Sequence, residues 1–410
     1  MSWSVKPKVI FITGPTASGK SDLAIYLAKK LNGEIINADS RQVYKYLDIG
    51  SGKWDVGKKI KIQRSKGESK INGVTFHLLS IAHPKRNYSL GRWLNDAHKA
   101  VRKIIKKGKV PIFCGGTILY LRAIKEGWVL PKVKPDYKLR KELEKKTNEE
   151  LYKEIKKIDP RRAKELDPNN KRRLIRALEI IYALGKVPKI KKEPKYEVLI
   201  IAPKFWDDTQ INADEDTQID ADKLNGIYAN RRGSINTQIY ADKDISENQR
   251  NNNPRESAYE NSIRDNQRDE YPRESALDPR LSAKIKKRLL KRVPGIIKEI
   301  KKLRKIGLSW RRIISFGLEY KWFGLYAEQV DSTQTNADYA DFTQTRQNKI
   351  DAGSALNSAK SALNSAKSAC YKDILRFAKR QIRELRKFEV HYVSSKKEAY
   401  NLCKKFLCYN

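Results

Sequence analysis

The sequence predicts an α/β fold in which a parallel sheet is flanked by helices and interrupted by an inserted all-helical subdomain. Two observations predict it. Short, continuous apolar runs alternate with segments of helical periodicity over residues 1–130, which is typical of doubly wound sheets. Residues 131–195 show helical periodicity almost throughout, carry many basic residues and contain no clear strand pattern.

The expected core begins with a strand over Lys8–Thr13, whose unbroken apolar run suits burial on both faces of a sheet. A helix follows over Ser21–Leu31, because its apolar residues recur on one face. The remaining elements are strands over Glu34–Ala38, Val110–Cys114 and Tyr196–Ala202, and helices over Ser89–Gly108, Gly115–Ile124, Leu281–Lys305 and Tyr371–Phe388.

Two stretches differ from the rest of the chain in composition. Residues 207–279 contain 17 acidic and 9 basic residues and repeat PRESA. Residues 331–369 contain 4 of each and repeat SALNSAK in tandem. Polar repeats of this kind bury too little apolar surface to offset the entropy of ordering, so we expect both to be low-complexity loop insertions.

The chain is strongly basic, with 87 Lys and Arg against 48 Asp and Glu and a formal net charge of +39. Outside the two insertions, 298 residues carry +47, so the basic character belongs to the expected fold. This charge favours a polyanionic partner, either nucleic acid or a membrane surface; a solvated lysine-rich surface is the alternative.

Several classes are disfavoured by the sequence. No apolar run reaches the roughly 18–20 residues of a membrane span, and residues 1–13 lack the features of a secretory signal. The four cysteines form no CxxC pair, which argues against a zinc module or a disulfide scaffold. We therefore expect a reducing, cytoplasmic location.

A phosphate loop lies between the first expected strand and helix, where GPTASGKS matches G-x-x-x-x-G-K-[ST]. Its glycines let backbone N–H groups point at phosphate oxygens, and the helix start adds a positive dipole end. This motif makes the expected core P-loop NTPase-like. The predicted phosphate-binding residues are Gly14, Pro15, Thr16, Ala17, Ser18, Gly19, Lys20 and Ser21, and Ser21 would also hold Mg²⁺. A nucleotide and another diphosphate would suit this cradle equally.

Polar residues also follow the second and third expected strands. Asp39 comes after the second strand, where a carboxylate faces the ligand crevice and can act as a general base or hold a metal through water. The alternative is that Asp39 caps a short helix. Gly115-Gly116-Thr117 follows the third strand at the same crevice, and its alternative is an ordinary tight turn.

Several motifs occur together in this chain. They are GPTASGKS at 14–21, DSRQVY at 39–44, DIGSGK at 48–53, CGGTILYLRAI at 114–124, DPRRAKELDPNNKRRLIRALEI at 159–180 and AKRQ at 378–381. In combination they resemble the tRNA dimethylallyltransferases, also called tRNA isopentenyltransferases. The resemblance runs through most of the chain outside the two insertions, which have no counterpart in that family.

The resemblance implies transfer of a dimethylallyl group from dimethylallyl diphosphate to N6 of the adenosine immediately 3′ of the anticodon in tRNA. The phosphate loop and a Ser21-bound Mg²⁺ would hold the diphosphate. Asp39 would accept a proton from N6, Thr117 would contact the diphosphate, and Arg288 aligns with a family arginine that reaches it. The implied partners are the tRNA anticodon arm and dimethylallyl diphosphate, with no membrane, and we expect a monomer.

The same resemblance implies where tRNA is held. The expected tRNA-binding residues are Asp39, Ser40, Arg41, Gln42, Lys171, Arg172, Arg173, Arg176, Lys379, Arg380 and Gln381. The chain departs from the family pattern in three segments: His77-Leu78-Leu79-Ser80, Arg383-Glu384-Leu385, and Gly317-Leu318-Glu319-Tyr320, where the family's tyrosine is displaced.

Three other functions fit parts of the sequence. An isopentenyltransferase acting on free adenine nucleotides would not need the basic helical subdomain or the AKRQ helix. A P-loop small-molecule kinase would not explain DSRQVY and AKRQ in one chain. A non-catalytic RNA-binding protein would not need both Lys20 and Asp39, which are present.

The expected layout has seven parts. They are a P-loop core at 1–130, a helical tRNA-binding subdomain at 131–195, a core strand at 196–206, an insertion at 207–279, further helices at 280–330, an insertion at 331–369, and a C-terminal basic helix and tail at 370–410.

Overall fold

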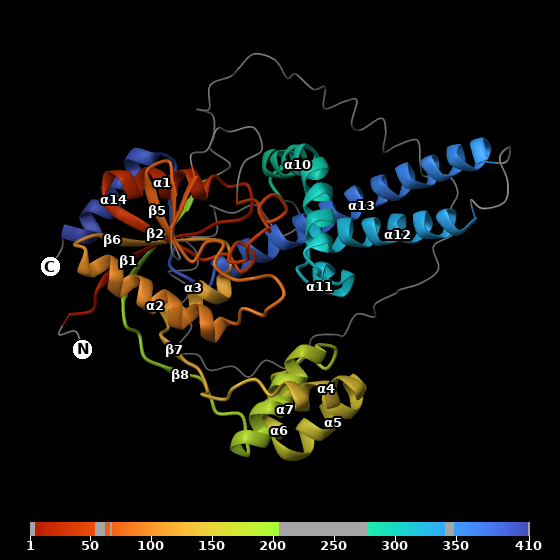
Figure 1. Ribbon diagram of the computed structural model, residues 1–410. Helices are drawn as coiled ribbons and strands as arrows, with labels where there is room; N and C mark the ends of the chain where they lie inside the picture. The colour runs from red at the N-terminus through yellow and green to blue at the C-terminus, as the bar shows by residue number, and fades with distance from the viewer. Residues whose placement is uncertain (1–4, 54–61, 66–67, 205–276, 341–347, 409–410) are drawn as a thin grey trace, which may run out of the picture. The chain divides into compact units, whose positions relative to one another are not determined.

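The computed structural model describes residues 5–53, 62–65, 68–204, 277–340 and 348–408 (Figure 1). The chain divides into two units, one of residues 1–205 and 281–410 and the other of residues 206–280. Only 277–280 of the second unit are described, so nearly all of the insertion expected at 207–279 lies outside the described residues.

Among the described residues, eight strands form the central sheet. They are β1 (Lys8–Ile12), β2 (Gly33–Asn37), β3 (Ile62–Ser65), β4 (Glu68–Ile71), β5 (Val74–His77), β6 (Val110–Cys114), β9 (Glu197–Pro203) and β10 (His391–Val393). The order is β10-β9-β1-β6-β2-β5-β4-β3. The first six strands pair in parallel, and β4 pairs antiparallel with both β5 and β3. The expected α/β fold with a mainly parallel sheet is confirmed.

The strand order determines where a ligand crevice forms. The chain passes from β1 to β2 and leaves room between them for β6, whereas β9 pairs with β1 on its other side. The connections that leave β1 and β6 therefore run in opposite directions along the sheet: β1 leads to β2, beyond β6, and β6 leads to β9, beyond β1. In open α/β sheets, ligands bind at such a switch point, outside the carboxyl ends of the strands.

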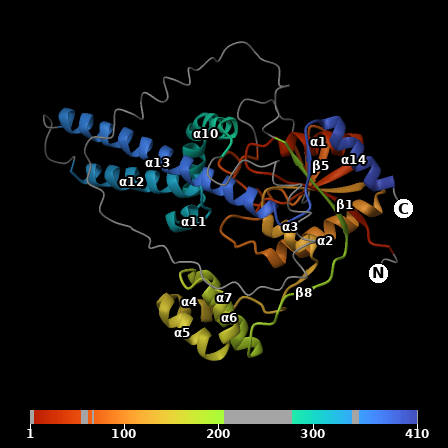
Figure 2. The same cartoon turned by 180° about the vertical axis from the view of Figure 1, so that it is seen from behind.

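Helices cover both faces of the sheet (Figures 1 and 2). Alternate side chains of β1 take opposite faces, as the period of a strand requires. Ile10 and Ile12 pack in the core formed with α1 (Lys20–Lys30) and α14 (Lys396–Cys408). On the other face lie α2 (Leu90–Lys106) and α3 (Ile118–Lys125), where Trp93 of α2 stacks on Tyr120 of α3 at 3.9 Å.

A buried ion cluster links β2, β5 and the end of α2. Glu34 Oε2 lies 2.7 Å from His77 Nε2, and Lys107 and Lys109 donate to Glu34 Oε1 at 3.0 and 2.9 Å. Burial acts to raise the pKa of Glu34, but these hydrogen bonds outweigh it and lower the pKa to about 2. His77, where the chain departs from the family pattern, is thus part of the sheet's own packing.

The helical subdomain consists of α4 (Tyr137–Lys145), α5 (Asn148–Ile158), α6 (Pro160–Lys164) and α7 (Lys171–Leu184). It has its own apolar core, in which Leu151, Ile155, Leu174 and Leu178 are fully buried. The two chain segments that lead into and out of it pair as β7 (Trp128–Val129) and β8 (Lys191–Lys192).

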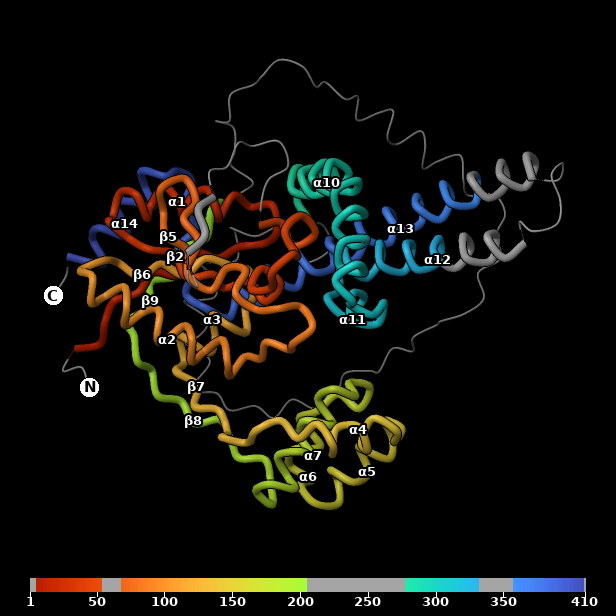
Figure 3. Tube along the Cα trace, viewed as in Figure 1, coloured from red at the N-terminus to blue at the C-terminus, as the bar shows by residue number. Residues whose placement is uncertain are grey.

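In the described part of the chain, four helices lie between residue 278 and β10: α10 (Pro279–Lys305), α11 (Trp310–Ile314), α12 (Glu319–Ala340) and α13 (Asn348–Leu385). In Figure 3, α12 and α13 run side by side. No helix within the described residues is both long and apolar enough to cross a bilayer.

The expectation of a loop over residues 331–369 is wrong for the residues that the structure describes. Residues 331–340 and 348–369 are helical. Alanines recur in this second insertion at 355, 359, 362, 366 and 369, in alternate steps of four and three, which places them on one helix face. Alanine is the strongest helix former, and Ala366 is buried while Ser365 is exposed. A compositional interpretation missed this heptad spacing of small residues.

Candidate functional site

The phosphate loop connects β1 to α1 at the carboxyl edge of the sheet. Gly14 and Gly19 have φ of 140° and 81°, values that side-chain-bearing residues rarely adopt, so the turn requires glycine at both positions. Helix α1 begins at Lys20, and Lys20 Nζ donates to the Pro15 carbonyl at 3.0 Å. Burial lowers the pKa of Lys20, and the nearby Arg288 guanidinium acts in the same direction.

Two hydroxyls beside this loop are buried without a partner. Thr13 Oγ1 and Ser18 Oγ have no hydrogen bond to any described residue. A Cβ added at Gly14 would lie 2.8 Å from Ser18 Oγ, so the glycine also keeps this cradle open. Because buried polar groups are normally satisfied, these hydroxyls suit an oxygen-rich ligand such as a diphosphate.

Ser21 lies in the first turn of α1 and is exposed. Within the described part of the chain, no group of three His, Cys, Asp or Glu side chains is arranged to hold a metal ion. A Mg²⁺ ion readily keeps waters and phosphate oxygens as ligands and needs one or two groups from the protein. The residues present therefore fit a cation that is bound mainly through its phosphate ligand.

Asp39 follows β2 and shapes the turn that comes next. Its Oδ1 accepts hydrogen bonds from the backbone N–H groups of Arg41 at 2.9 Å and Gln42 at 3.2 Å. The two interpretations of Asp39, as a cap and as a reactive carboxylate, are compatible because both bonds use one oxygen. No hydrogen bond to Oδ2 occurs among the described residues, which leaves that oxygen for a substrate proton.

Thr117 lies directly beside this turn. Its Oγ1 accepts a hydrogen bond from the backbone N–H of Ser40 at 3.0 Å. The loops after β2 and β6 approach so closely that a Cβ at Gly115 would collide with the Ala38 carbonyl. Gly115 therefore allows the contact that brings Thr117 to the Asp39 turn.

Arg288 reaches this edge from α10, more than 200 residues away in the sequence. Its Nη2 donates to the Gly52 carbonyl at 3.3 Å, and it is close enough to Lys20 to affect that residue's pKa. The structure therefore brings Lys20, Asp39, Thr117 and Arg288 to one edge of the sheet.

The eleven expected tRNA-binding residues fall into two groups. Exposed side chains are those of Ser40, Arg172, Arg173, Lys379 and Arg380. The others, apart from Asp39, make internal contacts: Arg41 with Glu319, Gln42 with the Ser51 carbonyl, Lys171 with the Glu144 carbonyl, Arg176 with Glu179 and the Val133 carbonyl, and Gln381 with the phosphate loop. Arg41, Gln42, Lys171, Arg176 and Gln381 thus have contacts within the fold, and their RNA contacts stay predictions.

Gln381 joins two loops of the site. Its side chain is buried on α13, where Oε1 accepts from Thr16 N–H at 3.1 Å and Nε2 donates to the Gly116 carbonyl at 2.7 Å. A Cβ at Gly116 would collide with this amide. One side chain thus connects the phosphate loop to the loop that carries Thr117.

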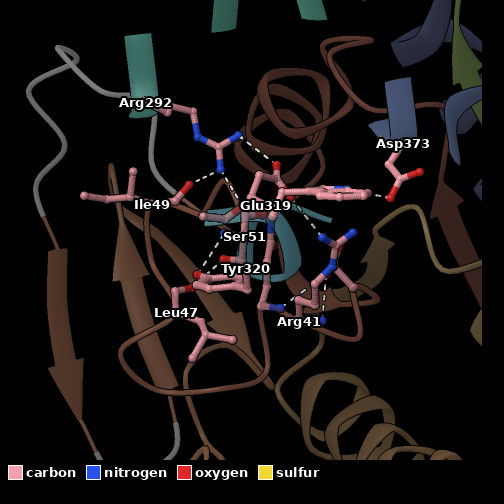
Figure 4. Close-up of polar contacts among 12 residues, drawn as sticks. Arg41, Leu47, Ile49, Ser51, Arg292, Glu319, Tyr320 and Asp373 are labelled. Atoms are coloured by element: carbon pink, nitrogen blue, oxygen red, sulfur yellow. Dashed lines mark hydrogen bonds and ion pairs between the residues drawn. The ribbon is translucent and has the colours of Figure 1, made fainter. Parts of the chain in front are cut away.

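A buried network holds the turn after Asp39 against the C-terminal helices (Figure 4). Arg41 Nη1 donates to Glu319 Oε2 at 3.1 Å, and the Arg41 guanidinium lies 5.6 Å from the Phe377 ring centroid. Glu319 also pairs with Arg292 at 3.5 Å, and Arg292 donates to the Gly50 carbonyl at 2.6 Å. Helices α10, α12 and α13 therefore all contact the loop after β2.

The DIGSGK loop wraps around a second carboxylate that sequence reasoning missed. Glu299 Oε2 accepts from the N–H groups of Asp48 and Ile49 at 2.8 and 2.7 Å. Tyr320 donates to the same carboxylate and accepts from Ser51 N–H at 3.1 Å. Burial raises the pKa of Glu299. The sequence does contain a signal for this buried carboxylate, because Glu299 is the single acidic residue of the otherwise basic helix α10.

Family comparisons match the N-terminal part of the chain. The family described as "Isopentenyl transferase" matches residues 7–65, and the family described as "IPP transferase" matches residues 42–227. Among solved structures, the chain resembles a eukaryotic dimethylallyltransferase described as acting on tRNA, with a TM-score of 0.55 and 21% identity over 92% of this chain and 70% of that one. At that identity the likeness concerns the fold.

Sequence relatives agree with these family matches. The tRNA dimethylallyltransferase of Endomicrobium trichonymphae is 43% identical over 192 residues, which are 46% of this chain and 61% of the relative. That of Anoxybacillus flavithermus is 40% identical over 199 residues, or 47% and 60%. The chain thus spans about three fifths of the length of these relatives. By sequence, residues 7–65 are thus similar to isopentenyl transferases and residues 42–227 to IPP transferases, and the relatives named here are tRNA dimethylallyltransferases.

Proposed function

We propose that this protein transfers a dimethylallyl group from dimethylallyl diphosphate to N6 of the adenosine 3′-adjacent to the anticodon in tRNA, releasing diphosphate. The observation that carries the proposal is the meeting of the phosphate loop, Asp39 and Thr117 at one sheet edge, in a chain related to tRNA dimethylallyltransferases. The match to 60–61% of the length of those relatives supports it further.

The proposed reaction needs a leaving group and a base. As N6 attacks C1 of the allyl group, the bond from C1 to the diphosphate oxygen breaks, and negative charge develops on the diphosphate. Lys20, the N–H groups of the phosphate loop and Arg288 would stabilise that charge. Asp39 Oδ2 would take the N6 proton, which a weakly nucleophilic exocyclic amine must lose.

Mg²⁺ bound by Ser21 and the diphosphate would supply further charge neutralisation on the leaving group. Gln381 would hold Thr16 and Gly116 in register around the donor. We further propose that the protein acts as a monomer in the cytoplasm. The four cysteines are free, which suits a reducing compartment.

Incubation with unmodified tRNA, dimethylallyl diphosphate and Mg²⁺, followed by nucleoside analysis, tests the proposal. The expected product is an N6-prenylated adenosine beside the anticodon. AMP and ATP serve as alternative acceptors in parallel reactions. Product on the free nucleotides with none on tRNA would instead identify an adenylate isopentenyltransferase, and γ-phosphate transfer to a small molecule would identify a kinase.

A further inference from the structure

A cluster of exposed basic residues surrounds one tyrosine outside the site described above. We call it the Tyr46 patch, and it consists of Lys45, Tyr46, His83, Lys85, Arg86 and Lys302. All six residues are exposed, and Tyr46 keeps 37% of its surface accessible. The Tyr46 and His83 ring centroids are 6.0 Å apart, and Lys302 Nζ lies 5.8 Å from the Tyr46 centroid.

Tyr46 lies at the tip of a well-anchored turn. Tyr44 and Leu47 on either side of the tip are buried, and Lys45 N–H donates to the Ala82 carbonyl at 2.8 Å. Tyr46 itself has a φ of 67°, in the left-handed region that favours glycine. Because glycine would adopt this conformation without strain, the turn alone does not account for an aromatic side chain here.

The patch lies at the ligand-binding edge of the sheet. Lys45 and Tyr46 belong to the loop after β2, and His83 to Arg86 belong to the loop after β5, which pairs with β2 in parallel. Both loops therefore leave the same edge as the phosphate loop and Thr117. Lys302 comes from α10, whose single acidic residue, Glu299, is buried.

The charge of the patch is uncompensated. It carries four permanent cations and no carboxylate, and none of the four forms an ion pair with a carboxylate of the described residues. An exposed ring among unpaired cations is the arrangement by which proteins hold single-stranded nucleic acid, with bases stacked on the ring and phosphates on the cations.

We propose that the Tyr46 patch binds the RNA strand beside the target adenosine, with a neighbouring base stacked on Tyr46 and phosphates held by Lys45, Lys85, Arg86 and Lys302. The inference rests on the proposed function. Extruding the target base unstacks its neighbours, and an aromatic side chain at the entry edge would compensate for that loss. An acidic protein surface would suit the cations, but it would not need the strained, exposed ring.

The ring is tested with a matched pair of variants, Tyr46→Gly and Tyr46→Phe. Glycine removes the ring and relieves the backbone, so the thermal midpoint should be unchanged or higher. The probe is an unmodified anticodon stem-loop RNA with adenosine 3′ of the anticodon, and its Kd is measured by fluorescence anisotropy. We expect the Kd to rise about ten-fold in Tyr46→Gly and to change less than two-fold in Tyr46→Phe.

The cations are tested by the salt dependence of RNA binding. The double variant Lys85→Gln/Arg86→Gln should reduce the slope of log K against log salt by about 1.4, because each phosphate contact on a single strand contributes about 0.7. The control is Lys29→Gln/Lys30→Gln, which removes two exposed lysines from the last turn of α1, towards the amino edge of β2. Its slope should match that of the wild type.

The outcomes separate this inference from the proposed function. Three results would each refute RNA binding by the Tyr46 patch. They are unchanged RNA affinity in Tyr46→Gly, an unchanged salt slope in Lys85→Gln/Arg86→Gln, and no RNA binding by the wild type. Wild-type protein that binds the stem-loop but forms no prenylated adenosine would overturn the proposed function, while the binding data would still decide the patch. Affinity for inorganic diphosphate should be the same in all four variants, since the patch does not touch the phosphate loop.

Discussion

Replacing Gln381 with leucine should damage the phosphate loop indirectly, because Gln381 itself has no contact with the substrate in the proposed reaction. Leucine has nearly the same volume but can make neither amide hydrogen bond. The Thr16 N–H and the Gly116 carbonyl, held at 3.1 and 2.7 Å, would both lose their partner. Gly116 is buried and Thr16 half-buried, so water can replace the lost bonds only in part.

The expected cost follows from these two groups. A buried polar group left unsatisfied costs about 1–3 kcal/mol, so two groups of which one is half-buried give about 2–4 kcal/mol. If half of this free energy destabilises the ordered, ligand-bound conformation of the loop, the Kd for inorganic diphosphate rises about 5–30-fold. The other half lowers the free energy of unfolding in urea by about 1–2 kcal/mol.

Binding of inorganic diphosphate by calorimetry and unfolding in urea measure the two parts. Glu384→Ala is the matched control, because Glu384 lies one turn further along α13 and makes a partly exposed ion pair with Arg122 at 3.1 Å. Such a pair contributes at most about 1 kcal/mol and does not reach the loop. Diphosphate affinity in Gln381→Leu equal to that in Glu384→Ala would refute the positioning role of Gln381.

Three further predictions follow from the same contacts. Asp39→Asn keeps an oxygen for the Arg41 and Gln42 N–H groups but loses the base, so turnover on tRNA should fall at least 100-fold while diphosphate binding changes little; unchanged turnover would contradict the assignment. Glu34 has a lowered pKa, so its contribution to stability is present above its ordinary pKa of about 4.5 and is lost as the pH falls towards 2. In urea titrations, Glu34→Gln should therefore unfold more easily than the wild type at pH 7 but lose less stability between pH 4.5 and 2. Tyr320→Phe leaves the Ser51 N–H unpaired and should lower the free energy of unfolding by about 1–3 kcal/mol, whereas a wild-type urea midpoint would show that water replaces the hydroxyl.

The core of the fold was predictable because its signals are local. The unbroken apolar run at Lys8–Thr13 and the glycine spacing after it specify a buried strand, a turn and a helix start within about 20 residues. The helix over 348–369 was missed although its signal, the spacing of alanines, is local too. Its apolar face is made of alanines, which score as weakly hydrophobic, so composition indicated a loop where spacing indicated a helix.

The candidate site divides in the same way. Lys20, Asp39 and Thr117 follow predicted strands, so strand order alone places them at one edge. The roles of Arg41 and Gln381 could not be predicted, because a motif does not indicate whether a polar side chain faces solvent or the interior. Arg41 has an oppositely charged partner 278 positions away, and Gln381 bonds a backbone N–H 365 positions away. Pairings at that separation depend on how the helices pack, which local pattern does not record.

The long-range pairings share one consequence for how the site is assembled. The loops after β1, β2 and β6 are each held by residues that follow the first insertion: Gly52 by Arg288, Asp48 and Ile49 by Glu299, Arg41 by Glu319, and Thr16 and Gly116 by Gln381. Helices α10, α12 and α13 thus act as a scaffold for loops encoded in the first 120 residues. An interruption between β9 and α10 is tolerable because loop-closure entropy grows slowly with length, whereas a shift of one helix turn in α13 would remove the Gln381 contacts. Selection for an intact site would therefore act on the register of these helices more strictly than on the length of the chain that precedes them.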